Sequence, residues 1–165
     1  MSNAAPTLLV VDDHPMALSG TTAFLAEVMP DVAVHAAGSA KEALHSLNQG
    51  LRPDIVLLDI WLNDGTGFDA MQAFKTVIPG ARFISMSAEA TPEIVGRARA
   101  LSACGFVGKH LDANAFTAAW HTAAKSPSRA ENRVAISASV TVTMRSTPKR
   151  KSTRLNSSHI TISYA

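Results

Sequence analysis

Side chains that can bind a cation and accept a phosphoryl group follow several apolar runs of the sequence. They are Asp12, Asp13, Asp59, Ser87 and Lys109. Three carboxylates held close together repel one another, so either their pKa values rise or a cation lies between them. Oxygen ligands favour a hard ion, and Mg²⁺ is commonly held by one or two carboxylates with waters and phosphate oxygens. Asp12, Asp13 and Asp59 are therefore candidate ligands of a Mg²⁺ site.

The type of each remaining side chain suits phosphoryl transfer. Asp59 is the candidate nucleophile, because a carboxylate can take a phosphoryl group as an aspartyl-phosphate. A bound cation and the Lys109 ammonium would offset the charge on the transferring group, where positioning and electrostatics supply most of the catalysis. Ser87 can hydrogen-bond a phosphoryl oxygen, and the small Ala88 leaves room for a phosphodonor.

These residues can act together only if the elements before them end at one place. Five apolar runs are predicted strands, at Thr7–Val11, Val32–Ala36, Asp54–Leu58, Arg82–Met86 and Gly105–Gly108. Segments with a period near 3.6 lie between them and predict helices. Strands that alternate with helices indicate parallel pairing. The nearly continuous apolar run "DIVLLDI" indicates burial on both faces of the sheet.

The helix starts carry recognisable signals. The predicted helices begin at Pro15, after a Ser39 cap with Glu42 reaching back, at Phe68 (ending at Val77), after a Thr91 cap, and after Asp112. In the first helix, Leu18, Leu25 and Val28 share one face and are predicted to point into the core. The result is a small doubly wound domain, in which ligands bind beyond the carboxyl ends of the strands.

Composition divides the chain near residue 125. Residues 1–125 carry 12 acidic and 8 basic side chains, whereas residues 126–165 carry 7 basic side chains and only Glu131 as an acid. No apolar run approaches the roughly 18–20 residues of a membrane span, and no secretory signal is visible. The single Cys104 cannot form an internal disulfide. A cytoplasmic protein without a membrane partner is expected.

Four stretches together resemble one known family. Residues 6–125, through "VVDDHP", "DIVLLDI", "FISMSA" and "GFVGK", are similar to the receiver domain of bacterial two-component response regulators. The resemblance implies a flavodoxin-like (βα)5 fold, an α/β doubly wound parallel sheet of strand order 2-1-3-4-5. It implies that Asp59 is the phosphoacceptor, that Asp13 binds Mg²⁺ directly and that Asp12 does so through water. Trp61 would lend its backbone carbonyl to the metal.

The same resemblance implies a switch and its output. Ser87 and Phe106 match the switch pair, whose hydroxyl moves toward the phosphoryl group while the ring turns inward. Lys109 matches the lysine that bonds the phosphoryl group. The donor would be a sensor histidine kinase, and the output face would be the fourth helix, fifth strand and fifth helix, with homodimer formation on phosphorylation. Such a phosphorelay domain is a signalling module, not a multiple-turnover enzyme.

"DDHP" further resembles the NarL/FixJ (LuxR)-like branch, whose members usually end in a DNA-binding helix-turn-helix that regulates transcription. Three domains of the sequence are expected: a disordered N-terminus at 1–5, the receiver at 6–125, and a linker or disordered basic tail at 126–165. The tail is too short for a helix-turn-helix, and its end, "STRLNSSHITISYA", resembles translated vector sequence. DNA binding is therefore expected of a full-length parent and not of this chain.

Two positions depart from the family pattern. His110 follows Lys109 where many receivers have proline, and is expected to be a solvated loop residue. The loop after Asp59 is longer and lacks the common Met-Pro-Gly. Its bulky Trp61 would either shield the phosphoryl group or pack on the loop.

Alternative functions stay open. A pseudo-receiver would act as an interaction module that is never phosphorylated. A haloacid-dehalogenase-like phosphatase would need a second Asp two residues after the nucleophile, where this chain has Trp61, although "NDGT" imitates part of that family's motif. A DNA-binding regulator acting through the tail is disfavoured by the tail's length.

Overall fold

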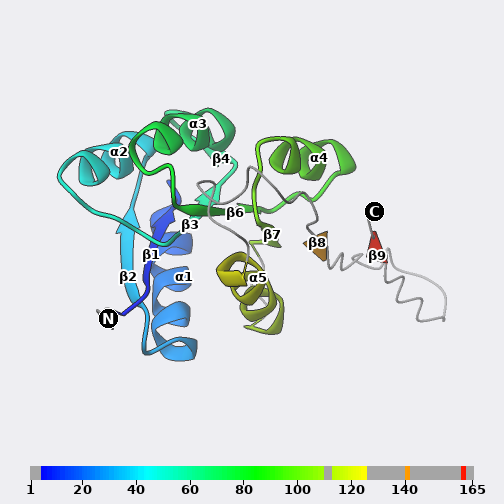
Figure 1. Ribbon diagram of the computed structural model, residues 1–165, viewed down its shortest axis with the longest axis horizontal. Helices are drawn as coiled ribbons and strands as arrows, with labels where there is room; N and C mark the ends of the chain where they lie inside the picture. The colour runs from blue at the N-terminus through cyan, green and yellow to red at the C-terminus, as the bar shows by residue number, and fades with distance from the viewer. Residues whose placement is uncertain (1–4, 110–112, 126–139, 142–160, 163–165) are drawn as a thin grey trace.

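The computed structural model describes residues 5–109, 113–125, 140–141 and 161–162. Its central sheet is parallel and has the order β2-β1-β3-β6-β7 (Figure 1). The strands are β1 (Thr7–Val11), β2 (Ala33–Ala37), β3 (Ile55–Asp59), β6 (Arg82–Ser87) and β7 (Gly105–Gly108). This order confirms the predicted 2-1-3-4-5 topology, because β4 (Trp61–Leu62) and β5 (Gly65–Thr66) form a separate antiparallel hairpin.

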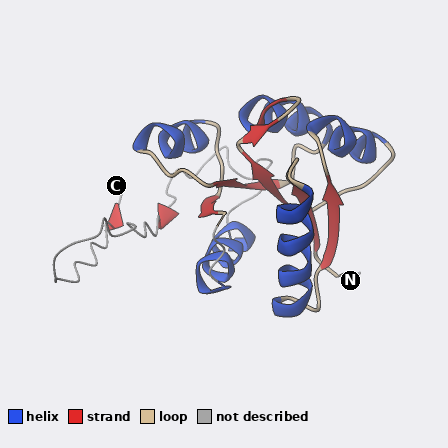
Figure 2. Ribbon diagram, turned by 180° about the vertical axis from the view of Figure 1, so that it is seen from behind, coloured by secondary structure: helices blue, strands red, loops and turns tan. Residues whose placement is uncertain are grey.

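Helices cover both faces of the sheet (Figure 2). They are α1 (Pro15–Val28), α2 (Ala40–Asn48), α3 (Gly67–Val77), α4 (Pro92–Ala100) and α5 (Ala113–Lys125). α1 and α5 lie on one face, where Leu25 and Phe116 pack against the sheet. α2, α3 and α4 lie on the other, where Leu47, Phe74 and Ala98 are buried.

Burial on both faces explains why β3 is a continuous apolar run, without the alternation of polar and apolar residues. All five of its residues are buried. Val56 and Leu58 face the core beneath α2 and α3, whereas Ile55 and Leu57 face the core beneath α1 and α5. A central strand with a helix layer on each side needs apolar side chains in both directions. The strand therefore brings its final residue, Asp59, to the sheet edge from a rigid, fully packed position.

The predicted helix starts are largely confirmed. Ser39 caps α2 by accepting a hydrogen bond from Glu42 N at 3.0 Å, and Thr91 caps α4 by accepting one from Ile94 N. The Glu42 carboxylate reaches back to Gly38 N, at 2.7 Å, one residue before the cap. Thr66 caps α3, so this helix begins one residue earlier than predicted.

A few predictions were wrong in detail. β2 and β3 each lie one residue later than predicted, so Asp59 ends β3 and does not follow it. Leu25 is buried and Leu18 partly buried, but Val28 is 38% exposed and lies outside the core. The hairpin of β4 and β5 was not predicted. The residues of its turn bond other parts of the chain, as described below, and this explains why the loop after Asp59 is long.

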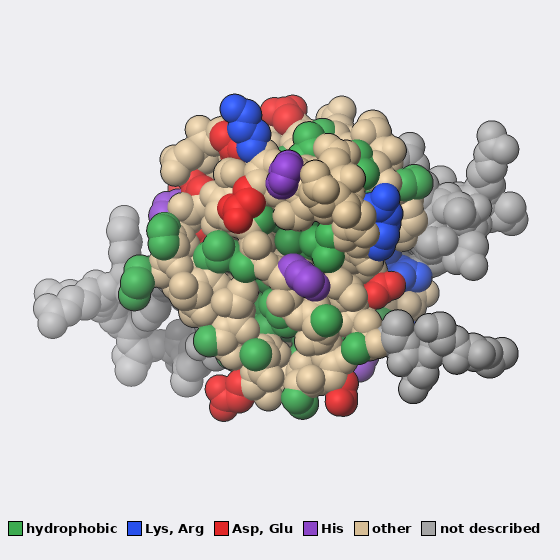
Figure 3. Space-filling model, turned by 90° about the vertical axis from the view of Figure 1, so that its left-hand side faces the viewer, with side chains coloured by type: hydrophobic (Ala, Val, Ile, Leu, Met, Phe, Trp, Pro, Cys, Tyr) green, Lys and Arg blue, Asp and Glu red, His purple; other side chains and the backbone are tan. Residues whose placement is uncertain are grey.

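β2 is an edge strand, and most of its residues are at least partly exposed at that edge of the sheet. Figure 3 views the molecule from this side, with charged and histidine side chains scattered among apolar ones. A shallow groove here is lined by His35 of β2 and His45 of α2, among other residues.

Several predictions fall on residues outside the described part of the chain. These are the N-terminus up to residue 4, His110, Asp112, and most of the tail from 126 to 165. Within the tail, only β8 (Val140–Thr141) and β9 (Thr161–Ile162) are described, and they pair antiparallel. No helix among the described residues combines the length and the apolar character needed to cross a bilayer.

Ser102→Gly is expected to stabilise the protein by about 0.5–1 kcal/mol. Ser102 has a φ of 61° directly after α4. Its amide bonds Arg99 O and the next amide bonds Ala98 O, which is the Schellman pattern that favours glycine at this position. A left-handed non-glycine residue costs about 1–2 kcal/mol, partly offset by the extra freedom of unfolded glycine.

Urea unfolding measures the effect of Ser102→Gly. Ser46→Gly, the same change inside α2, is the matched control and should destabilise the protein. A loss of stability in both variants would contradict the assigned origin of the effect.

Candidate functional site

Two fully buried aspartates meet at the carboxyl edge of the sheet. Asp12 directly follows β1, Asp59 ends β3, and these strands are parallel neighbours. Both residues are 0% exposed. The Asp13 side chain, next along the chain, is only 5% exposed. The parallel pairing therefore brings the three predicted carboxylates to one place, although β1 and β3 are far apart in sequence.

Lys109 brings the compensating positive charge. Its backbone amide continues the pairing of β7 with β6 by bonding Ser87 O at 2.9 Å. Its Nζ lies 2.5 Å from Asp59 Oδ2 and 3.0 Å from Asp12 Oδ2. The lysine therefore sits between the two buried carboxylates, an arrangement that the sequence alone did not specify.

The two partners influence each other's pKa. Burial raises the pKa of the Asp59 carboxyl above its ordinary 3.8, and the hydrogen bonds from Lys109 and Trp61 only partly oppose this. Burial by itself lowers the pKa of the Lys109 ammonium. Its hydrogen bonds to Asp59 and Asp12, with their charges, outweigh that effect and raise the pKa above 10.5. The Lys109 ammonium therefore stays charged, whereas burial makes the Asp59 carboxyl harder to ionise.

The two predicted switch residues occupy adjacent strands. Ser87 ends β6, is buried, and its Oγ accepts a hydrogen bond from Glu89 N at 3.2 Å. No hydrogen bond joins it to Asp59 in the described part of the chain. The Phe106 ring, on β7, is buried with Ile60, Phe68 and Ala98 in a small core beneath α4. The Phe106 ring thus lies inward, between the residue that follows β3 and the helix α4.

Trp61 contacts Asp59 through its backbone. Trp61 N donates a hydrogen bond to Asp59 Oδ1 at 3.2 Å. The residue is 52% exposed, so about half of its surface does not pack on the loop. This residue therefore orients one oxygen of Asp59 and leaves a large apolar side chain at the surface near the site.

The hairpin of β4 and β5 ties the carboxylate site to α2. Asn63 N, in its turn, donates to Asp13 Oδ2 at 2.8 Å. The neighbouring Asp64 carboxylate accepts hydrogen bonds from Ala40 N at 3.2 Å and Lys41 N at 3.0 Å, at the N-terminus of α2. A carboxylate is favourable there, because unpaired amides and the helix dipole attract negative charge. Asp64 thus fixes the turn that orients Asp13.

Asp64→Ala is expected to weaken divalent-cation binding about tenfold, at the low end of the range known for residues that orient metal ligands. Removing the carboxylate frees the turn from α2, so Asn63 N holds Asp13 less firmly. Mg²⁺ titration followed by tryptophan fluorescence measures the effect, since Trp61 lies in the same hairpin. Asp31→Ala, at an exposed position before β2, is the control. Equal Mg²⁺ affinity in Asp64→Ala and wild type would contradict this role.

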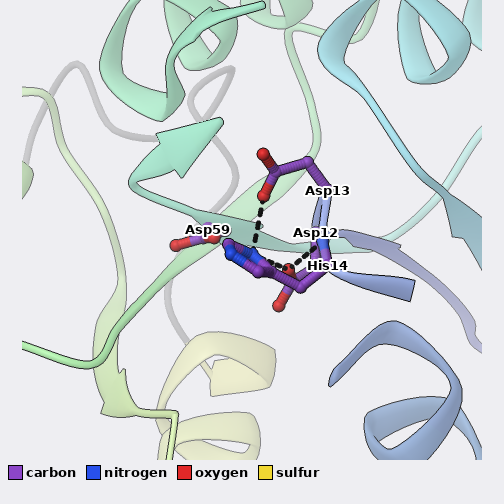
Figure 4. A group of neighbouring side chains, drawn as sticks. All are labelled: Asp12, Asp13, His14 and Asp59. Carbon is purple, nitrogen blue, oxygen red and sulfur yellow. Dashed lines mark hydrogen bonds and ion pairs between the residues drawn. The ribbon is translucent and has the colours of Figure 1, made fainter. Parts of the chain in front are cut away.

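His14 lies against the same carboxylates. Its Nδ1 is 2.9 Å from Asp13 Oδ1 and 3.3 Å from Asp12 Oδ1, and the side chain is 66% exposed. Figure 4 shows the imidazole between these carboxylates, with Asp59 beside it. From the sequence, no role was assigned to His14, so this contact was missed.

The donor set fits a hard divalent cation. Asp12 Oδ2, Asp13 Oδ1 and Asp59 Oδ2 are buried, and within the described residues they are contacted by the Lys109 and His14 nitrogens as ion pairs. Three carboxylates against one lysine leave an excess of negative charge even with an imidazole nearby. Carboxylate oxygens that converge in this way are typical Mg²⁺ ligands. Asp12, Asp13 and Asp59 could therefore hold the ion.

The sequence thus indicated the charged residues of the site but not the residues that hold them in place. It did not indicate Asn63 and Asp64, or Gly67, which lies against the backbone of Asp59. The stretch "NDGT" was compared with a phosphatase motif. An Asp-Gly pair between short extended segments is a recognised hairpin signal, and this signal could have revealed the turn. In the structure, Asn63 to Thr66 form that turn and the following cap, which gives no support to the phosphatase reading.

Comparison with known proteins agrees with this geometry. The family model described as "Response regulator receiver domain" matches residues 8–121. The transcriptional activator protein ExaE of Pseudomonas putida is 33% identical over 62% of this chain and 47% of its own length. The nitrate/nitrite response regulator protein NarL of Escherichia coli is 30% identical over 75% of this chain and 57% of its own length. The chain spans about half the length of these curated relatives.

Solved structures show the same fold. A LuxR-family two-component response regulator from Aurantimonas sp. aligns with a TM-score of 0.65 and 27% identity, covering 78% of this chain and 98% of that one. The chemotaxis protein CheY4 of Vibrio cholerae aligns with a TM-score of 0.66 and 20% identity, covering 73% of this chain and 99% of that one. The second likeness concerns the fold alone.

Proposed function

This chain belongs to the response regulator receiver domain family, and on that premise we propose that it accepts a phosphoryl group on Asp59 from the phosphohistidine of a sensor histidine kinase. The observation that carries the proposal is the buried Asp59 carboxylate, with Lys109 Nζ 2.5 Å from one oxygen and two further carboxylates beside it. An aspartate with only a structural role would not need a lysine and two further carboxylates around it. The receiver domain is proposed to extend over residues 6–125.

Each residue has a distinct part in the proposed transfer. An Asp59 oxygen forms the new O–P bond while the N–P bond of the phosphohistidine breaks and its electron pair stays on the histidine nitrogen. Lys109 moves its contact from Asp59 to a phosphoryl oxygen and offsets the charge there. Asp13 would hold Mg²⁺ directly, Asp12 would do so through water, and the Trp61 carbonyl would be a further ligand. When bound, Mg²⁺ supplies charge stabilisation to the phosphoryl oxygens.

The switch proposal concerns Ser87 and Phe106. Once Asp59 carries a phosphoryl group, the Ser87 hydroxyl leaves Glu89 N and donates to a phosphoryl oxygen. The backbone after β6 then moves, and with it the packing of Phe106 against Ala98 of α4. The face formed by α4, β7 and α5 changes as a result. Such a modification shifts a pre-existing equilibrium between two states.

The proposed output is control of transcription in a full-length parent, with homodimer formation on phosphorylation. The printed names of the relatives include a transcriptional activator and a nitrate/nitrite response regulator, and this chain covers about half of each. DNA contact is proposed for a further domain of that full-length parent, and not for the receiver domain. On this proposal the chain is a signalling domain that is phosphorylated, and not a multiple-turnover enzyme.

Acetyl phosphate with Mg²⁺, followed by intact-mass measurement, tests the proposal. Wild-type protein is expected to gain one phosphoryl group, and Asp59→Asn none, because the amide is a poor nucleophile. Asp54→Asn is the matched control: Asp54 precedes the same strand, accepts a hydrogen bond from Thr7 N at 2.8 Å, and lies outside the site. It should be phosphorylated like the wild type.

Two other results would point elsewhere. If wild-type protein gains no adduct from acetyl phosphate or a phosphorylated kinase, the chain is a pseudo-receiver. Steady turnover of a phosphomonoester would indicate an aspartyl-nucleophile phosphatase.

A further inference from the structure

His14 is placed as a ligand would be. One ligand atom from each of Asp12, Asp13, His14 and Asp59 lies within 4.8 Å of all the others. The imidazole Nδ1 is 2.9 Å from Asp13 Oδ1 and 3.3 Å from Asp12 Oδ1. Neighbouring ligands of an octahedral ion with bonds of about 2.1 Å are about 3 Å apart, so these separations match adjacent coordination positions.

Burial gives a second, independent observation. Asp12 Oδ2, Asp13 Oδ1 and Asp59 Oδ2 are buried oxygens whose partners within the described residues are ion pairs with the Lys109 and His14 nitrogens. Buried polar atoms nearly always have hydrogen-bond partners. The Asp13 oxygen among them is the one nearest to His14. The carboxylates thus approach the site from its buried side, and the imidazole approaches it from the solvent side.

The donor chemistry then separates one class of ion from another. Carboxylates suit hard ions such as Mg²⁺ and Mn²⁺, whereas an imidazole ligand favours ions such as Co²⁺ and Zn²⁺. We propose that His14 is a fourth protein ligand of the carboxylate site, which therefore binds borderline transition-metal ions in preference to Mg²⁺. This rests on the proposed function only in that the carboxylates bind a divalent cation. The imidazole would bind on the exposed side of the ion, where Mg²⁺ would keep water.

Direct detection of a coordinated nitrogen tests the proposal. Protein with one equivalent of Mn²⁺ is studied by electron spin echo spectroscopy, which detects a ¹⁴N nucleus bound to the metal. The chain has six histidines, and each is changed to alanine in turn. Only His14→Ala is expected to lose the ¹⁴N signal. His35 and His45 are needed controls, because they line one groove and offer the competing imidazole pair.

Affinity supplies the second readout. Co²⁺ and Mg²⁺ affinities are measured by calorimetry for wild type, His14→Ala and His121→Ala, the last at an exposed position on α5. The ratio of Co²⁺ to Mg²⁺ affinity is expected to fall about tenfold in His14→Ala, as for loss of one ligand interaction, and to stay at the wild-type value in His121→Ala.

The outcomes separate the inference from the function beneath it. A wild-type protein that binds Mg²⁺ and is phosphorylated, but shows no ¹⁴N signal from His14, overturns the inference alone. Equal losses of Co²⁺ and Mg²⁺ affinity in His14→Ala also overturn it, since His14 then only orients Asp13. If no divalent cation binds to the wild type, the cation site itself is wrong, and the proposed function loses its support as well.

Discussion

Replacing Gly67 by alanine is expected to displace Asp59 and to destabilise the protein by about 2–3 kcal/mol, in the range known for overpacked sites. A Cβ built on Gly67 would lie 2.0 Å from Asp59 O and 2.9 Å from both Asp59 C and Ile60 Cα. These are backbone atoms, so no side-chain rotation relieves the overlap. Gly67 N also bonds Ile60 O at 2.8 Å, which holds the two segments together.

The displacement should be visible in function as well as in stability. Moving the backbone of Asp59 shifts its carboxylate relative to Lys109 Nζ and to Asp12. Phosphorylation by acetyl phosphate should therefore slow by at least about tenfold, since misplacement of reacting groups by about 1 Å can reduce rates a hundredfold.

Urea unfolding and the phosphorylation rate measure the two effects of Gly67→Ala. Gly20→Ala is the matched control, because Gly20 lies within α1 and a Cβ there meets nothing within 4 Å. Alanine should stabilise that helix by about 1 kcal/mol. If Gly67→Ala were as stable as wild type, the hairpin would be free to move away from Asp59, and the close approach would have no structural importance.

Lys109→Ala is expected to keep the fold but to lose about 2–3 kcal/mol of stability in the absence of divalent cations, somewhat below the usual loss for a broken buried ion pair. Asp12 and Asp59 are both 0% exposed, and Lys109 Nζ lies within 3.0 Å of an oxygen of each. Without the ammonium, two buried carboxylates would face each other. Mg²⁺ should therefore stabilise Lys109→Ala more than it stabilises wild type.

The pH dependence follows from the direction of the Asp59 shift. Its folded pKa is raised above 3.8 by burial. A raised folded pKa gives stability that is fully present below the unfolded pKa and is lost as pH rises through the folded pKa. In Lys109→Ala this folded pKa rises further, because the hydrogen bond and the charge that lower it are gone. The stability loss of the variant should therefore shrink as pH falls toward 4.

Urea unfolding in chelator and in Mg²⁺, at several pH values, measures these effects. Lys41→Ala is the control, since Lys41 is exposed and uses only its backbone amide near the site. A loss of stability that is independent of pH and of Mg²⁺ would show that Lys109 acts by packing and not by charge.

Phosphorylated Lys109→Ala should also fail to dimerise, as measured by analytical ultracentrifugation.

The fold could be predicted from sequence because its local signals agree with one another. The apolar run of β3 indicated burial on both faces, and Ser39 and Thr91 are helix caps by residue type and position. Boundaries were less certain, since one residue more or less in β2 changes little in composition. Val28 was wrong because helical spacing shows which residues share a face but not how far the neighbouring layer extends.

The hairpin is the clearest failure of prediction. Its strands have only two residues each, too few for a pattern to be visible. Its bonds reach to Asp13 and to α2, which are 50 and 23–24 residues away in sequence. No property of Asn63 or Asp64 alone indicates those partners.

By itself, the sequence determined which charged residues end which strands, and thus that Asp12, Asp13, Asp59 and Lys109 would meet at one edge. Parallel strands put all their carboxyl ends together, so order along the chain is enough for that conclusion. Only the tertiary structure decided how they meet: Lys109 between two buried carboxylates, Asn63 on Asp13, Gly67 against the Asp59 carbonyl, and the His14 imidazole at the solvent side. Those contacts depend on loop paths and distances of a few ångströms, which residue types and spacing do not encode locally.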